Sequence, residues 1–143
     1  MKKVLLILTL SMGVVACSGG KTKSVVENQQ TKKDVVEVLY FHGAQRCATC
    51  KAIEKHTKAL IESAYAEPLK SGKLVFRSVD ITQEEALAEK YEVSWSSLIL
   101  VDYDKSGKES AINLTEFAFG YARNAPDKFK QDLSERITGM LNN

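Results

Sequence analysis

The chain has 143 residues, a formal net charge of +2 and 44% hydrophobic residues. A chain of this length forms one domain and can bury a core without disulfide staples. The small net charge, and the lack of a dense basic stripe interleaved with aromatic residues, argue against a nucleic-acid partner.

Residues 1–16 have the pattern of an export signal. Two lysines follow Met1, and residues 4–15 are mostly apolar. About 20 apolar residues are needed to span a bilayer, so this run fits the shorter hydrophobic region of a signal peptide. The segment Val-Val-Ala-Cys at 14–17 resembles the lipobox of bacterial lipoproteins, in which cleavage leaves Cys17 as the lipidated N-terminus. Ordinary secretory cleavage near Ala16 is the alternative.

Residues 17–34 are predicted to be the lipidated N-terminus and a flexible linker. They are polar, contain glycine and hold few large apolar residues. A flexible segment of about this length has a mean reach of roughly 20–25 Å. Ser18 after Cys17 resembles the sorting signal for the outer membrane, and no acidic run argues for display on the outer face. We therefore expect a lipid-anchored envelope protein facing the periplasm, with its folded domain at residues 35–143.

The folded part begins with a nearly uninterrupted apolar run at 35–41, typical of a strand covered on both faces. Residues 47–67 carry apolar side chains at helical spacing, which predicts a helix that Pro68 ends. Residues 74–81 are predicted to form a second strand. Thr82 is predicted to cap the next helix, with Glu85 completing an approximate capping box.

The second half continues with an apolar strand at 98–101 and a less regular edge strand at 111–119. In the latter, Phe117, Phe119 and Tyr121 alternate, which favours strand packing over a cofactor site. A final helix begins at Pro126, a residue favoured at the first helical position. This order of elements predicts an α/β fold with a mixed sheet of about four strands and helices on both faces.

Cys47 and Cys50 are the residues most suited to chemistry. They form a Cys-Ala-Thr-Cys motif between the first strand and the helix that follows it. The free N–H groups and the dipole at a helix start favour a thiolate at Cys47. Cys50 lies one turn further on the same face, where it can attack a mixed disulfide formed by Cys47. We expect Cys47 to be the nucleophile and Cys50 the resolving thiol.

Two other interpretations of the cysteine pair remain open. A zinc site needs two more soft or imidazole ligands, and the only third thiol is Cys17. His42 is near the pair, but one histidine does not complete a tetrahedron, and His56 falls off the cysteine face of the helix. A structural staple would close only a short loop and remove little entropy from the unfolded chain.

The pattern around the pair resembles the thioredoxin superfamily. Tyr40 and Phe41 precede a short loop and the motif Cys-x-x-Cys-Lys, and a Lys-Tyr-x-Val segment at 90–93 precedes the buried strand. The similarity spans about residues 35–141 and implies a thioredoxin-like fold with a redox-active cysteine pair and no bound cofactor or metal. Among its branches, the chain is most similar to single-domain lipoproteins known as arsenic-operon-type nitrophenyl compound nitroreductase subunits.

The chain departs from the superfamily at positions that shape the site. Ser97 stands where thioredoxins carry a cis-proline, with Trp95 and Ser96 beside it, and the resemblance implies that these three residues line the substrate groove. The strand position of the superfamily's buried acid corresponds to Leu39. Glu37, two residues earlier, either replaces that acid or pairs with a lysine at the strand edge.

These features predict a membrane-tethered thiol–disulfide oxidoreductase or electron carrier. Its partners would be protein or small-molecule disulfides, the membrane through its lipid anchor, and a membrane-linked electron donor that reduces the pair again. The alternative is a binding module, in which the two thiols capture a metal or metalloid or the domain serves as an accessory subunit of a larger reductase. The absence of the proline at Ser97 favours this alternative.

Overall fold

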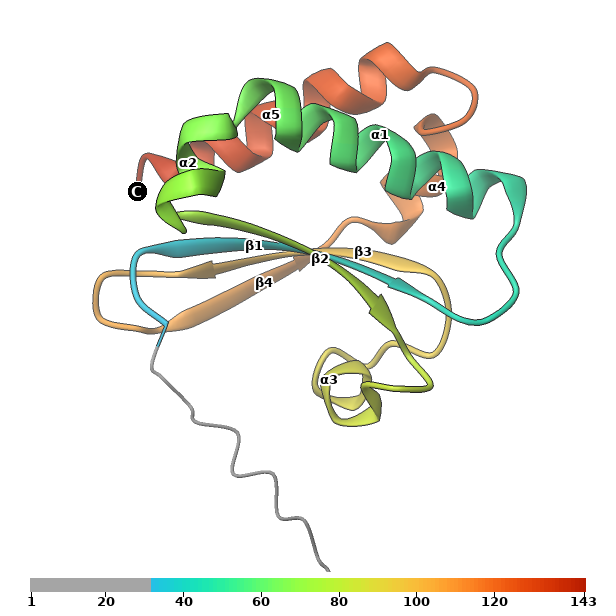
Figure 1. Ribbon diagram of the computed structural model, residues 1–143, viewed down its shortest axis with the longest axis horizontal. Coiled ribbons are helices and arrows are strands. Elements are labelled where there is room, and N and C mark those ends of the chain that lie inside the picture. Colours follow the sequence, from blue (N-terminus) through green and yellow to red (C-terminus); the bar gives the residue numbers. More distant parts are fainter. Residues whose placement is uncertain (1–31) are drawn as a thin grey trace, which may run out of the picture.

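A computed structural model describes residues 32–143, and the predicted signal peptide and Cys17 lie outside this range. The described chain alternates strands and helices (Figure 1). In order, its elements are β1 (Val35–His42), α1 (Ala48–Ala64), α2 (Ala66–Ser71), β2 (Leu74–Asp80), α3 (Glu85–Lys90), β3 (Ser97–Tyr103), β4 (Glu109–Asn113), α4 (Thr115–Tyr121) and α5 (Pro126–Leu141).

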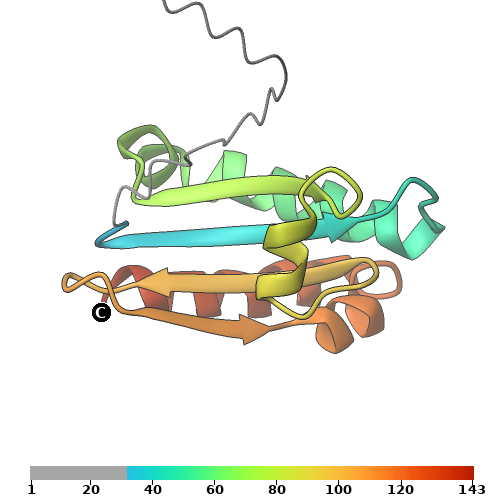
Figure 2. The ribbon, with the colours of Figure 1, turned by 90° about the horizontal axis from the view of Figure 1, so that it is seen from below.

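The four strands form one mixed sheet in the order β2-β1-β3-β4. β1 pairs in parallel with β2 and antiparallel with β3, and β4 adds antiparallel to the outer side of β3. Helices α1, α4 and α5 cover one face, and the short α3 lies on the other (Figures 1 and 2). The predicted α/β fold, with about four strands and helices on both faces, is confirmed.

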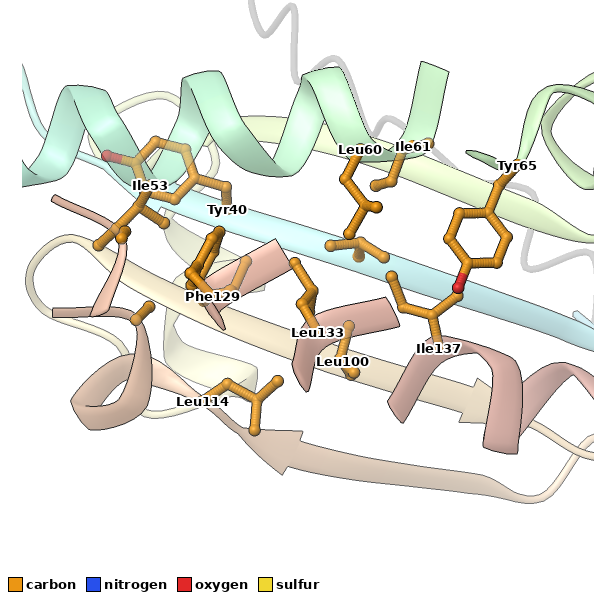
Figure 3. Packing of buried hydrophobic residues seen from close by; sticks show 14 of the residues in the cluster. Tyr40, Ile53, Leu60, Ile61, Tyr65, Leu100, Leu114, Phe129, Leu133 and Ile137 are labelled. Atoms are coloured by element: carbon orange, nitrogen blue, oxygen red, sulfur yellow. The ribbon is translucent and has the colours of Figure 1, made fainter. Parts of the chain in front are cut away.

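The core is divided between the two faces of the sheet. Val38 and Tyr40 of β1 face the larger cluster, which Ile53 of α1 and Leu133 of α5 complete (Figure 3). The intervening residue Leu39 faces the smaller cluster beneath α3. Burying one large apolar side chain contributes about 1.5–3 kcal/mol, so the fully buried central strand holds both layers together. No helix within residues 32–143 is long and apolar enough to cross a membrane.

The predicted helix at 47–67 is in fact two helices. α1 ends at Ala64, and α2 begins at Ala66 with Pro68 as its third residue. A proline ring clashes with the carbonyl four residues earlier, here that of Ala64, but costs no hydrogen bond within the first turn of a new helix. The chain therefore bends at Tyr65, and Pro68 does not end the helix.

The predicted edge strand at 111–119 was wrong in its second half. β4 ends at Asn113, and residues 115–121 form α4. Phe117 and Tyr121 lie one helical turn apart with ring centroids 5.4 Å from each other, and Phe117 also stacks on Phe129 at 5.5 Å. The alternating aromatic residues imitate a strand period, but the buried residues Thr115 and Ala118 lie three apart, at helical spacing, and Phe117 packs on α5.

The capping role predicted for Thr82 was also wrong. The Thr82 hydroxyl and backbone N–H both donate to the carboxylate of Asp80, at 2.7 and 2.9 Å. This local turn uses the hydroxyl before the helix begins. α3 starts three residues later, at Glu85, without a side-chain cap.

Candidate redox site at the start of helix α1

Cys47 and Cys50 are joined by a disulfide at the first turn of α1, with Cα atoms 5.0 Å apart. Cys47 is the N-cap residue, and its Sγ accepts a hydrogen bond from the Cys50 N–H at 3.0 Å. Cys47 is exposed, whereas only 6% of Cys50 is exposed. An incoming group therefore meets the Cys47 sulfur, and the Cys50 sulfur lies behind it.

Tyr40 ties the cysteine turn to the central strand. Its ring is fully buried, and its hydroxyl donates to the Cys50 carbonyl at 2.8 Å. If this hydrogen bond were lost, a buried polar group would have no partner, which lowers the free energy of unfolding. The first turn of α1 is thus held against β1 by a side chain from the strand that leads to it.

A polar chain of Arg46, Glu54 and Ser78 lies beside the cysteine pair. The Arg46 guanidinium forms an ion pair with the Glu54 carboxylate, which also accepts from the Ser78 hydroxyl at 2.6 Å. Arg46 lies over the Tyr40 ring, with its guanidinium carbon 5.4 Å from the centroid. Glu54 is seven residues after Cys47, close to two turns, so both residues lie on one face of the helix.

The ion pair shifts the acidity of both partners. Partial burial alone would raise the pKa of Glu54, but the Ser78 hydroxyl and the Arg46 charge more than reverse it, so the pKa lies below its usual 4.5. Burial alone would lower the pKa of Arg46, and Tyr40 and Glu54 together raise it above its usual value. The pair therefore stays charged at neutral pH, with Arg46 next to Cys47 in the sequence and Glu54 about one turn of helix after Cys50.

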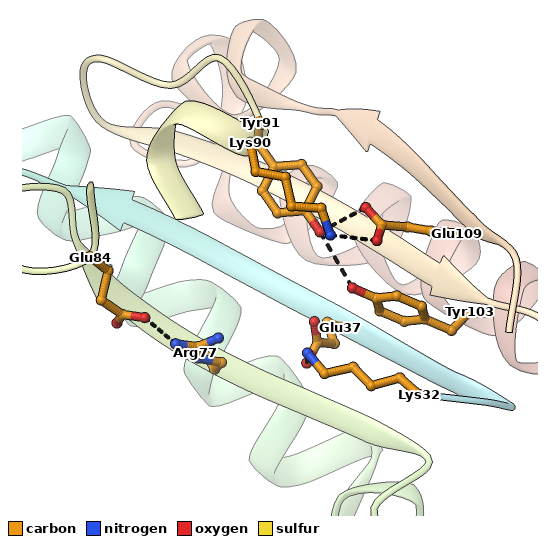
Figure 4. A network of polar contacts seen from close by, with 8 residues as sticks. All are labelled: Lys32, Glu37, Arg77, Glu84, Lys90, Tyr91, Tyr103 and Glu109. Carbon is orange, nitrogen blue, oxygen red and sulfur yellow. Dashed lines mark hydrogen bonds and ion pairs between the residues drawn. The ribbon is translucent and has the colours of Figure 1, made fainter. Parts of the chain in front are cut away.

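Glu37 is not at the cysteine pair. Its buried carboxylate accepts from the Lys32 ammonium at 2.7 Å, near the start of β1 (Figure 4). The cysteines follow the other end of that strand, and five residues of strand separate Glu37 from His42 by about 17 Å. Of the two predicted roles for Glu37, the structure favours pairing with a lysine, and Leu39 is a core residue.

The predicted groove residues lie at the end of the sheet where the cysteines lie. Ser97 is the first residue of β3 and pairs with Phe41 of β1. Ser96 and Ser97 are buried, and the Ser97 hydroxyl donates to the Trp95 carbonyl at 3.1 Å. Trp95 is 59% exposed. Residues 32–143 contain no cis peptide bond, so the bond before Ser97 is trans.

Neither histidine completes a metal site with the cysteines. His42 stacks near Tyr40, with ring centroids 5.9 Å apart, and its Nδ1 lies 3.2 Å from the Gly43 carbonyl oxygen. His56 lies two turns into α1, where burial and the charges of Lys55 and Lys130 lower its pKa. Across residues 32–143, no three histidine, cysteine or acidic side chains gather in a group that could hold a metal ion.

No protein-family model and no curated protein matches the chain by sequence. Solved structures do match it by fold. The Trx4 domain of ERdj5 superposes with a TM-score of 0.50 over 76% of this chain and 81% of that domain, at 16% identity. The chain has a thioredoxin-like fold. The thioredoxin of Fasciola hepatica matches with a TM-score of 0.48 at 23% identity over 76% of this chain and 83% of its own.

Within this thioredoxin-like fold, the sequence located the cysteine pair but missed the side chains that support it. Glu54 was not singled out, although its spacing from Cys47 and Cys50 places it on their face of α1. Tyr40 was noted only as part of the motif, because nothing in a sequence shows that its hydroxyl reaches Cys50. The predicted strand at 111–119 puts Phe119 at the edge of the sheet, whereas in the structure its ring packs on Trp95.

Proposed function

We propose that this chain is a thiol–disulfide oxidoreductase that works through Cys47 and Cys50. The observation that carries the proposal is the arrangement of the pair, with Cys47 exposed at the helix N-cap and Cys50 buried one turn later. Helix N–H groups stabilise a thiolate at that position. The exposed sulfur accepts a partner, and the buried sulfur is reached only from within the protein.

The reaction exchanges one disulfide for another. The Cys47 thiolate attacks one sulfur of a substrate disulfide, forms a mixed disulfide and expels the other substrate sulfur as a thiolate. The Cys50 thiolate then attacks the Cys47 sulfur, which releases the second substrate thiol. The substrate gains two electrons, the chain becomes the Cys47–Cys50 disulfide, and a dithiol donor must return the two electrons for another cycle.

The setting that fits this chemistry is the cell envelope. We propose that lipidation of Cys17 tethers the domain to a membrane, on the periplasmic side of the outer membrane, and that a membrane-linked dithiol donor reduces it. The lipobox-like segment at 14–17 and the export signal before it support this proposal. A place among the nitrophenyl compound nitroreductase subunits rests on the sequence resemblance.

A second candidate function is capture of a thiophilic metal or metalloid by the reduced pair. Ser97 favours it, because the proline at this position in thioredoxins discourages metal binding at the thiols. Native mass spectrometry of the reduced protein with Cu(I), Zn(II) or arsenite separates the two functions. A bound ion lost in both Cys47→Ser and Cys50→Ser would favour capture over exchange.

The decisive experiment for exchange is a trapping variant. In Cys50→Ser the mixed disulfide at Cys47 cannot be resolved, so we expect covalent adducts that accumulate in cells and disappear on reduction. Cys47→Ser is the matched control and should trap few or none. If a folded Cys50→Ser protein captures no partner, the proposal is wrong.

The reduction potential of the pair then sets the direction of electron flow. A value near about −270 mV indicates a reductase, and one near about −120 mV indicates an oxidant. Equilibration of the protein with glutathione or dithiothreitol buffers measures it directly.

A further inference from the structure

A hollow of about 630 Å³ opens at the sheet end where the cysteines lie. Its lining comes from the loop before β3, the first residue of β3, the last residue of β4 and helix α4: Glu92, Trp95, Ser97, Asn113, Thr115, Glu116 and Phe119. Ser97 pairs with Phe41, one residue before β1 ends and the chain turns toward Cys47. A peptide bonded to Cys47 would therefore have this hollow within reach of its neighbouring residues.

The apolar part of the hollow is a pair of aromatic rings. The Trp95 and Phe119 ring centroids lie 5.3 Å apart, with the ring planes tilted by 32°. Although it packs on Phe119, Trp95 remains 59% exposed, more than any other exposed large hydrophobic residue within 32–143. The face of an indole ring is the aromatic surface that attracts cations most strongly.

The charged residues of the hollow are both acidic. Glu92 and Glu116 line it, and among the described residues 32–143 no lysine, arginine or histidine does. Within residues 32–143 neither glutamate forms an ion pair, whereas Glu54, Glu84 and Glu109 each have a basic partner. An aromatic pair beside two free carboxylates is complementary to a positive charge.

The backbone at Glu92 adds a second argument. α3 ends with bonds from the Val93 N–H to the Ala88 carbonyl (2.8 Å) and from the Glu92 N–H to the Glu89 carbonyl (3.0 Å). This helix ending places Glu92 in the left-handed region, at φ 54°. Glycine is the usual residue there, because a Cβ comes too close to the following carbonyl oxygen in this conformation. A carboxylate is thus held at the hollow at a cost to stability.

We propose that this hollow binds the cationic side chain of an arginine or lysine near the reactive cysteine of a substrate peptide. If the chain also has the proposed function, disulfides flanked by basic residues would react faster than others. This second statement rests on the proposed function. Binding of the cationic side chain itself does not depend on thiol chemistry. The two statements can therefore be tested separately.

Binding is measured with the oxidised protein, because its single tryptophan, Trp95, reports on the hollow. The probes are two six-residue peptides with serine in place of cysteine, one carrying arginine beside it and the other the uncharged analogue citrulline. We expect saturable change in Trp95 fluorescence and about threefold to tenfold tighter binding of the arginine peptide, weakening with salt. Equal binding of both peptides, or binding of neither, would overturn the proposal.

Variants test whether Glu92 and Glu116 cause the preference for the arginine peptide. The double change Glu92→Gln and Glu116→Gln should abolish the preference for arginine, and Glu67→Gln on α2, an exposed glutamate elsewhere, should keep it. Glu92→Gly suits the left-handed backbone, so we expect a weaker preference without a loss of stability. An unchanged preference in both hollow variants would place the binding elsewhere and refute the assignment.

Substrate choice is measured with the reduced protein and disulfide-linked forms of the same two peptides. We expect the ratio of their reduction rates to favour arginine in the wild type and in Glu67→Gln, and to fall close to one in the double variant. If neither disulfide is reduced, the proposed function fails while the fluorescence result still decides the cation site. If the arginine peptide binds better but reacts no faster, the proposed substrate preference is wrong.

Discussion

At the scale of single residues, the site depends on side chains that fix the cysteine turn. The Tyr40 hydroxyl donates to the Cys50 carbonyl, and Arg46, which is ion-paired with Glu54, lies over the ring of Tyr40. The position of the cysteine pair could be predicted, because Cys47 and Cys50 lie three residues apart where a predicted strand leads into a predicted helix. Their supporting contacts could not, because each joins residues from different elements and depends on side-chain directions.

Glu54 should make the stability of the protein depend on pH. Its pKa in the folded chain lies below 4.5, so its contribution is present above about pH 4.5 and is lost as the pH falls through the folded value. Glu54→Gln should lower the unfolding free energy at pH 7 by about 0.5–1 kcal/mol and by less at pH 3. Urea unfolding at the two pH values measures this difference.

The matched control is Glu67→Gln, since Glu67 is exposed and forms no ion pair within the described part of the chain. Its effect on stability should be small and equal at both pH values. A Glu54→Gln variant that loses as much stability at pH 3 as at pH 7 would show that the side chain acts through packing and not through its charge.

At the scale of elements, the accuracy of the predicted helices and strands depends on how clear the hydrophobic pattern of each segment is. β1 and β2 were predicted within one residue of their observed ends, β3 within two, and α5 at its observed start, because each carries a clear hydrophobic pattern. The bounds of the short helices α3 and α4 were not predicted correctly. α4 has seven residues, too few to establish a helical period against the alternation of its aromatic residues, and only packing on α5 decides its conformation.

α3 is held to the sheet by polar contacts as well as by its buried Ala88. Glu109 of β4 accepts from the Tyr91 hydroxyl at 3.0 Å and pairs with Lys90 (Figure 4). Burial, the Tyr103 hydroxyl and Glu109 together raise the pKa of Tyr91 well above its usual value. This network fixes the end of α3, and with it the loop that carries Trp95.

Glu109→Ala should weaken the attachment of the end of α3 to the sheet. We expect a loss of about 1–2 kcal/mol in unfolding free energy, since Tyr91 and Lys90 lose their shared acceptor. Hydrogen exchange at the Val93 amide, which is bonded to the Ala88 carbonyl, should become faster. Glu135→Ala on the exposed side of α5 is the control and should leave that amide protected; equal exchange in both variants would contradict the role given to Glu109.

At the scale of the whole molecule, the fold could be predicted from the sequence and is confirmed, whereas the cellular setting stays a prediction. The alternating β and α segments, and the limits on how they connect, predict a mixed sheet with helices on both faces. The predicted export signal and Cys17 lie outside residues 32–143, so attachment to a membrane stays a prediction from the sequence. Trp95 and Ser97 of the hollow were expected to line a groove, but its α4 residues, Thr115, Glu116 and Phe119, could not be predicted, because the sequence pattern assigned most of that segment to a strand.

Attachment is tested on the full chain expressed in a bacterium. We expect the wild type to take up labelled palmitate and to sediment with the outer membrane, since more than one acyl chain gives stable anchoring. Cys17→Ala should remain unlabelled and soluble in the periplasm, with its Cys47–Cys50 pair intact. A wild type that is soluble and unlabelled would rule out the lipid anchor.

The direction of β1 has a consequence for how a tethered domain would face its surroundings. The described chain enters β1 at one end of the sheet, and the cysteine turn follows the other end, about 23 Å away along eight residues (Figure 1). If the domain is tethered as proposed, the tether joins it at the Val35 end of β1, and the cysteine turn lies at the end of the sheet opposite the attachment. Soluble partners would then reach the Cys47 thiol directly. A donor embedded in the same bilayer would need a domain that extends from the membrane to the cysteine turn.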